Sequence, residues 1–121
     1  NTVLRGMSEY ILYHKTTCST SRNALQLLKE NGVEPEIRLY LDQPPTQKEL
    51  SELMKKLGGK AIDIVRTKEK LYQENYKDKK LTKREWLKIL AEHPILIERP
   101  ILIKGDKAVI GRPVEQVLTL L

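Results

Sequence analysis

The sequence predicts an α/β protein in which a mixed four-stranded sheet carries a helical insertion. The prediction rests on the order of the elements: strand, helix and strand at the start, a block of helices in the middle, and a hairpin with a last helix at the end. Two strands joined by a helix should lie parallel with a right-handed crossover, whereas hairpin strands are antiparallel.

The β-α-β segment is expected between residues 9 and 41. Residues 9–13 form a short apolar run that predicts a strand, and residues 21–30 carry apolar side chains at helical spacing before the stop signal Asn31-Gly32. Residues 35–41 alternate as a second strand does, which should place Ile37, Leu39 and Leu41 on one face.

The helical insertion is expected over about residues 44–93. Capping-box sequences at residues 46–49 and 82–85 predict the starts of two helices, which should end near Leu57 and His93. Residues 61–66 and 69–76 predict shorter helices between them.

The chain should end with a hairpin and a helix. Residues 100–104 and 107–110 flank a Gly105-Asp106 turn, and residues 113–121 form a helix with proline in its first turn. The complete order is the thioredoxin-like pattern and predicts one domain over residues 7–121. Met7-Ser8 resembles a natural start, so residues 1–6 are expected to be an expression remnant.

Composition indicates a globular protein of the cytoplasm. The chain has 121 residues, of which 40% are hydrophobic and 31% charged, as in ordinary soluble domains. We find neither a signal peptide nor an apolar stretch near the roughly 20 residues that span a bilayer, so no membrane association is expected. A single cysteine cannot form an internal disulfide, which fits a reducing compartment.

The net charge of +6 does not by itself indicate nucleic-acid binding. The densest basic run, residues 77–84, has no interleaved aromatic residue and no accompanying nucleic-acid motif. Clustered lysines of this kind usually face water, so we expect no nucleic-acid partner.

Cys18, the only cysteine, lies just before the first predicted helix. A helix N-terminus offers unpaired N–H groups and partial positive charge, which favour the thiolate. His14 and Arg22 are expected to add cationic groups on either side, and the neighbours Thr17 and Ser19 are polar, unlike those of an inert buried cysteine. Cys18 is therefore predicted to be a nucleophile with a pKa of roughly 3.5–7.5.

Arginines at four positions predict an oxyanion substrate, because the guanidinium fork donates paired hydrogen bonds and stays charged. Each one alone could equally form a structural salt bridge. Arg99 lies between two apolar runs and so needs a partner if buried. The set is Arg22, Arg66, Arg99 and Arg112.

Other sites for oxyanions or metals do not fit the sequence. A Cys-x5-Arg phosphatase loop would need arginine where Ala24 stands, and no Walker A loop occurs. One cysteine and two histidines are too few for a zinc site, so no metal is expected. His93, beside Pro94 at a predicted helix end, is interpreted as structural.

Separated motifs occur in colinear order from about residue 8 to residue 121. They are Tyr13-His14-x3-Cys18-x-Thr20-Ser21-Arg22-Asn23, Tyr40-Leu41-x2-Pro44-Pro45-Thr46, Arg66, His93-Pro94-Ile95-Leu96-Ile97-x-Arg99-Pro100-Ile101 and Gly111-Arg112-Pro113. Together they resemble the glutaredoxin-coupled arsenate reductases of the ArsC family.

This resemblance implies a thioredoxin-like fold and a Cys18 thiolate that attacks arsenate to form a thiol-arsenate adduct. It implies that Arg66, Arg99 and Arg112 bind the oxyanion and that His14 helps to keep Cys18 ionised. It also implies a cis peptide bond at Arg99-Pro100 beside the active cysteine, which is an uncommon and checkable feature.

The cysteine count then indicates where the electrons come from. With Cys18 alone, the resolving thiols must be external, and glutathione as co-substrate with glutaredoxin as partner are the natural candidates. No bound cofactor is expected, and the chain should act as a monomer.

Ser21 and Arg22 are further candidate substrate-binding groups, although Ser21 could equally hydrogen-bond the thiolate or cap the helix.

Two alternatives remain open at this point. The chain could be a thiol redox protein that handles glutathione mixed disulfides without arsenate. It could also resemble the Spx-like transcription regulators, which would bind RNA polymerase through a basic helical face. Those regulators use a Cys-x2-Cys pair, where this chain has Ser21 at the second position, and they lack the Gly-Arg-Pro element at residues 111–113.

Overall fold

The computed structural model of this protein describes residues 9–121. The expectation for residues 1–6, and the suggested start at Met7, lie outside this range. Among the described helices, none is long and apolar enough to cross a membrane.

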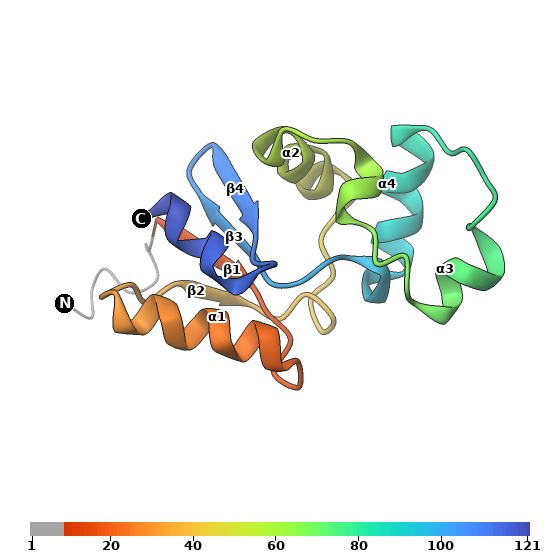
Figure 1. Cartoon of the computed structure of the whole chain (residues 1–121). Helices are drawn as coiled ribbons and strands as arrows, with labels where there is room; N and C mark the ends of the chain where they lie inside the picture. The colour runs from red at the N-terminus through yellow and green to blue at the C-terminus, as the bar shows by residue number, and fades with distance from the viewer. Residues whose placement is uncertain (1–8) are drawn as a thin grey trace.

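The sheet has four strands in the order β2-β1-β3-β4 (Figure 1). The central strands β1 (Tyr10–Tyr13) and β3 (Ile101–Lys104) are antiparallel, as are β3 and β4 (Lys107–Ile110). The edge strand β2 (Glu36–Arg38) runs parallel to β1. The predicted mixed sheet and thioredoxin-like order are thus confirmed.

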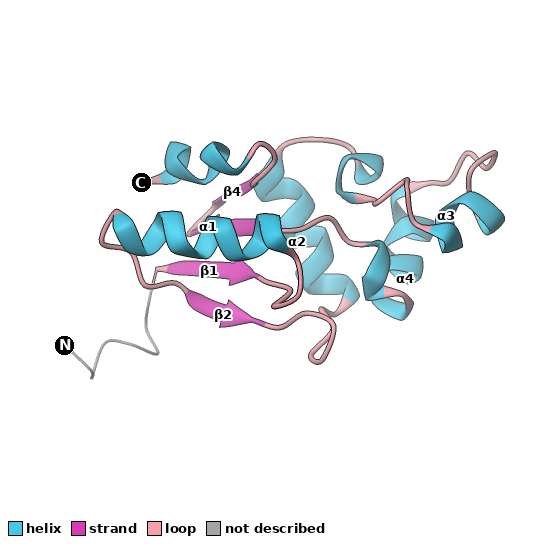
Figure 2. Ribbon diagram, turned by 60° about the horizontal axis from the view of Figure 1, so that its bottom comes forward, coloured by secondary structure: helices cyan, strands magenta, loops and turns pink. Residues whose placement is uncertain are grey.

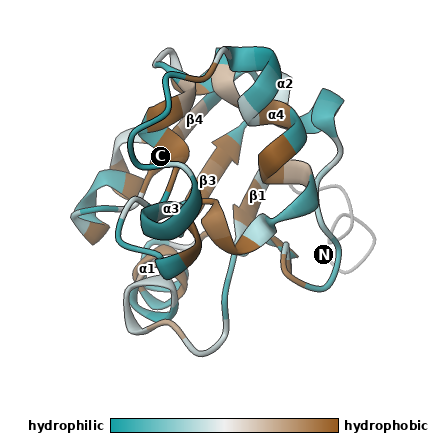
Figure 3. Ribbon diagram, turned by 90° about the vertical axis from the view of Figure 1, so that its right-hand side faces the viewer, coloured by the Kyte–Doolittle hydropathy of each residue, from teal (hydrophilic) through white to brown (hydrophobic). Residues whose placement is uncertain are grey.

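Helices cover both faces of the sheet (Figures 1 and 2). On one face, α1 (Ser19–Glu30) and the 3₁₀ helix η4 (Val114–Leu120) pack on Leu12 and Leu102. On the other face, α2 (Gln47–Leu57) packs on Ile101 and Ile103. Because successive strand residues point to opposite faces, β3 contributes to both cores. Figure 3 shows the resulting concentration of hydrophobic residues on β1 and β3.

The insertion between β2 and β3 is helical, as predicted; α2 covers the sheet, and the helices that follow it lie beyond one end of the sheet (Figure 1). Capping boxes begin α2 at Thr46 and α4 (Lys83–Glu92) at Thr82, where each threonine hydroxyl accepts from a glutamate N–H three residues on. Trp86 of α4 stacks on Tyr72 with ring centroids 6.2 Å apart. The remaining elements are η2 (Ala61–Ile64), α3 (Lys70–Asn75) and η3 (Pro94–Leu96).

The structure corrects the prediction for the second strand. Only residues 36–38 pair with β1, and the expected apolar face is wrong, because Ile37 and Leu41 are 39% and 37% exposed. Tyr40 is fully buried instead. As an edge strand β2 has one neighbour, and once its pairing ends the chain turns Tyr40 inward, which alternation cannot reveal.

The helix boundaries differ from the prediction at two places that bear on function. Helix α1 begins at Ser19, two residues early, so that Cys18 itself is the N-cap residue in an extended conformation. The last helix is a 3₁₀ helix over Val114–Leu120. The first shift brings the thiol directly to the helix N-terminus.

Candidate active site

Cys18 lies in the loop between β1 and α1, and its carbonyl accepts the first helical hydrogen bond, from Arg22 N at 2.9 Å. The side chain is partly buried. Burial raises the pKa of the thiol, but the backbone N–H of Ser21, the guanidinium of Arg99 and the backbone N–H of Thr20 act against it. The balance lowers the pKa of Cys18, which favours the thiolate of a nucleophile.

Arg99 supplies the positive charge that acts on this thiol. It precedes β3, its peptide bond to Pro100 is cis as expected, and the residue is only 8% exposed. Its Nε and Nη1 atoms are buried and have no hydrogen-bond partner within residues 9–121. A buried guanidinium of this kind is costly unless an acceptor binds to it.

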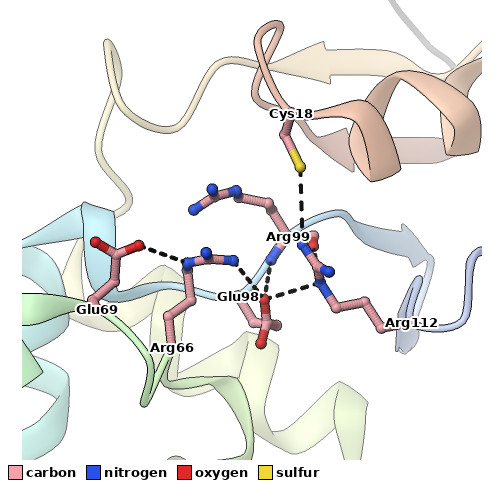
Figure 4. Close-up of polar contacts among 6 residues, drawn as sticks. All are labelled: Cys18, Arg66, Glu69, Glu98, Arg99 and Arg112. Carbon is pink, nitrogen blue, oxygen red and sulfur yellow. Dashed lines mark hydrogen bonds and ion pairs between the residues drawn. The ribbon is translucent and has the colours of Figure 1, made fainter.

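Arg112 approaches Cys18 from the end of β4. Its Nη2 atom lies 3.8 Å from Cys18 Sγ, and its Nε donates to the carbonyl of Arg99 at 2.8 Å (Figure 4). The preceding Gly111 has its N–H bonded to the carbonyl of Pro100 at 2.9 Å. Arg112 is therefore held against the segment that carries Arg99.

Glu98 connects the arginines to one another (Figure 4). Its Oε1 accepts from Arg66 Nη1 at 3.1 Å and from the backbone N–H of Arg99 at 3.2 Å, and it lies 3.2 Å from Arg112 Nε. Arg66 is also paired with Glu69 at 3.1 Å. This carboxylate fixes Arg66 and Arg112 in place, whereas Nε and Nη1 of Arg99 have no partner in the described part of the chain.

His14 and Ser21 form a buried pair beside the Cys18 loop. The Nδ1 atom of His14 lies 2.6 Å from Ser21 Oγ, which also accepts from the backbone N–H of Lys15 at 3.1 Å. These bonds occupy the Ser21 hydroxyl, and the N-cap position belongs to Cys18. Burial, and then the charge of Arg22, lower the pKa of His14, so the expectation of a cationic His14 is wrong. Its suggested influence on Cys18 stays a prediction.

Arg22 is not part of the arginine cluster. Its Nη1 donates to the carbonyl of Thr16 at 3.0 Å, an exposed contact within the loop. The structure thus brings Arg66, Arg99 and Arg112 together through Glu98, whereas Arg22 stabilises the turn that presents the thiol.

The residues that carry the sequence motifs thus meet in one site. Comparison with known proteins identifies the same family as those motifs do. Residues 13–120 match the family model described as the ArsC family. The chain belongs to the ArsC family.

Relatives in this family are similar over nearly their whole length. The arsenate reductase of Haemophilus influenzae is 46% identical over 113 residues, which cover 92% of this chain and 97% of that protein. The uncharacterized protein YfgD of Escherichia coli (strain K12) is 47% identical over 90% of this chain and 93% of its own. The solved arsenate reductase from Vibrio cholerae superimposes with a TM-score of 0.89 at 41% identity, covering 93% of this chain and 97% of that one.

Sequence reasoning missed two residues of this ArsC site. Glu98 could have been found as a carboxylate beside Arg99 between two apolar runs, because such a charge needs a cationic partner. Tyr40 is fully buried, and its hydroxyl is close to Arg99. In the sequence it is only one residue of a motif, with no predicted role of its own. In the described range, no three His, Cys, Asp or Glu side chains gather as a metal site.

Proposed function

We propose that this ArsC-family protein is an arsenate reductase in which the Cys18 thiolate attacks arsenate and external thiols supply the electrons. The observation that carries the proposal is a thiol of lowered pKa beside Arg99, whose buried Nε and Nη1 atoms have no hydrogen-bond partner in the described chain. A thiolate nucleophile beside hydrogen-bond donors that are free to bind an anion is the arrangement expected for a reaction with an anionic electrophile.

The first step forms a bond between Cys18 Sγ and arsenic. An As–O bond breaks, and the departing oxygen takes up protons from solvent and leaves as water. Charge accumulates on the remaining oxygens, and Arg99 and Arg112, which both act on the thiol, stabilise it. The backbone N–H groups at the start of α1 keep the attacking sulfur ionised beforehand.

The reduction of arsenate to arsenite then requires two electrons. Overall, one arsenate and two thiols give one arsenite, one disulfide and one water. Cys18 is regenerated and is the only cysteine of the chain, so both thiols come from outside. We propose glutathione as co-substrate and glutaredoxin as the partner that resolves the final mixed disulfide. No resident cofactor enters this scheme.

The relatives support the substrate class, since the proteins from Haemophilus influenzae and Vibrio cholerae are named arsenate reductases. The requirement for glutathione places the proposed reaction in the reducing cytoplasm. One copy of the chain supplies the nucleophile and the arginines that the scheme uses, so we propose that it acts as a monomer.

A coupled assay tests the proposal. Arsenate, glutathione, glutaredoxin, glutathione reductase and NADPH are mixed with the wild type or with Cys18→Ser, and NADPH oxidation is followed. We expect arsenate-dependent oxidation that Cys18→Ser abolishes. Equal activity in the serine variant would show that Cys18 is not the nucleophile. A reactive Cys18 without arsenate turnover would instead favour the glutathione-linked redox alternative.

A further inference from the structure

Tyr40 has no place in the scheme above, although its position is unusual. It follows the edge strand β2, and its side chain is fully buried. Its ring stacks on that of Tyr13, with centroids 6.1 Å apart and an angle of 13° between the planes. The Tyr40 hydroxyl has no hydrogen-bond partner within residues 9–121.

The groups around this hydroxyl are those of the candidate site. Arg99 is the charge that acts on it most strongly, followed by Arg66 and then Cys18. Arg99 Nε and Nη1 likewise lack a partner in the described chain. Tyr40 and Arg99 are therefore close together but not aligned to satisfy each other.

The chemistry of these groups defines what is missing. A guanidinium can only donate hydrogen bonds, and a phenol that accepted one from Arg99 would still need an acceptor for its own proton. Burial raises the pKa of Tyr40, against the lowering by Arg99, so the phenol keeps that proton at neutral pH. The missing partner is a group rich in acceptor lone pairs, which describes an oxyanion.

We propose that the Tyr40 hydroxyl is a further oxyanion-binding group, which donates a hydrogen bond to an oxygen of the tetrahedral anion that Arg99 holds beside Cys18. The inference rests on the proposed function in its substrate class, a tetrahedral oxyanion. It adds a neutral donor to a site otherwise built from arginines. A neutral donor selects oxygen geometry without adding charge.

The test measures binding without chemistry. Inorganic arsenate is titrated into Cys18→Ser protein, and the dissociation constant is obtained from amide chemical shifts in NMR spectra. The same titration follows in Cys18→Ser with Tyr40→Phe added. A hydrogen bond to a charged group makes a difference of roughly tenfold or more, so we expect the second dissociation constant to be higher by about that factor.

Tyr13→Phe in the same Cys18→Ser background is the matched control. It removes the same atom from the stacked partner ring, but Tyr13 lines a separate pocket with Arg38 and Glu49. We expect its arsenate affinity to stay unchanged. Because the Tyr40 hydroxyl has no protein partner, its removal should not lower the melting temperature, which separates a binding role from a structural one.

The outcomes distinguish the two proposals. If Tyr40→Phe binds arsenate as well as its background, an ordered water rather than the anion satisfies the hydroxyl. The Tyr40 role is then overturned while the proposed function stands. If the Cys18→Ser background itself binds no arsenate, the oxyanion site and the Tyr40 role fall together.

Discussion

Arg112 Nη2 lies 3.8 Å from Cys18 Sγ, although the two residues are 94 positions apart in the chain. The contact joins the two halves of the fold, since Cys18 begins α1 in the β-α-β half and Arg112 follows β4 in the hairpin half. The antiparallel pairing of β1 with β3 brings these halves together. The sheet therefore places a thiolate-favouring helix terminus opposite cationic side chains.

Arg99→Leu should weaken arsenate binding by roughly 10–100-fold, because the variant removes charge-assisted hydrogen bonds to the anion. The dissociation constant is measured by NMR titration. Stability against urea should not fall, since the leucine replaces a buried guanidinium whose Nε and Nη1 atoms have no protein partner. Arg84→Leu, the same change on the exposed start of α4, serves as control. Unaltered arsenate affinity in Arg99→Leu would argue against an oxyanion role.

The alkylation of Cys18 by iodoacetamide should depend on pH with a midpoint below the ordinary thiol value of about 8.5. Only the thiolate reacts, so the rate should fall as the pH drops through the lowered folded-state pKa. By linkage, the thiolate stabilises the folded protein above the unfolded-state pKa, and this contribution is lost as the pH falls through the folded-state pKa.

Two comparisons check this interpretation of the thiol. The urea-unfolded protein should titrate near the ordinary value, because the helix terminus and Arg99 no longer act on the sulfur. Arg99→Leu should move the folded-state midpoint upward. A folded-state midpoint equal to the unfolded one would show that Cys18 is not activated.

Local signals were sufficient to predict most of the fold. The capping boxes at Thr46 and Thr82 depend on residues three positions apart, and both are present. The position of Cys18 before a helix was equally visible, because a polar segment separated an apolar run from an amphipathic one. Such features are set by short-range hydrogen bonds, which a sequence displays directly.

The predictions that were wrong or missing concern side chains whose environment is set by the folded structure rather than by adjacent residues. Burial lowers the pKa of His14, but the burial of this side chain is a property of the folded structure that local spacing does not display. Glu98 and Arg66 form an ion pair although they are 32 positions apart in the sequence, so no spacing rule identifies the pair. Tyr40 turns inward at the end of an edge strand, where alternation no longer holds.

Glu98→Gln should lower the stability of the fold by about 1–2 kcal/mol, since a neutral amide replaces a half-buried carboxylate shared by several donors. Arg66 and Arg112 should lose their fixed positions, which raises the KM for arsenate by roughly fivefold. Urea unfolding and the coupled assay measure the two effects. Glu92→Gln on the exposed end of α4 should change neither quantity. A Glu98→Gln enzyme with unaltered KM would show that the carboxylate does not position the arginines.

Gly111→Ala should damage both stability and activity, because a Cβ at this position would lie 2.8 Å from Pro100 Cγ and 3.1 Å from Val117 Cγ1. The proline ring cannot rotate away, so the backbone must move and carry Arg112 with it. We expect a loss of about 1–3 kcal/mol in stability, as for other overpacked sites. Arsenate turnover should fall more than the fraction of folded protein does.

Gly105→Ala separates these two effects. Gly105 has a φ of +58° with nothing within 4 Å of an added Cβ, so the alanine costs about 1–2 kcal/mol through backbone strain alone. The turn lies at the far end of β3 from Arg99. Urea unfolding should show similar losses in the two variants, whereas the coupled assay should show reduced turnover only in Gly111→Ala. Wild-type turnover in Gly111→Ala would mean that the packing of Gly111 on Pro100 does not set the position of Arg112.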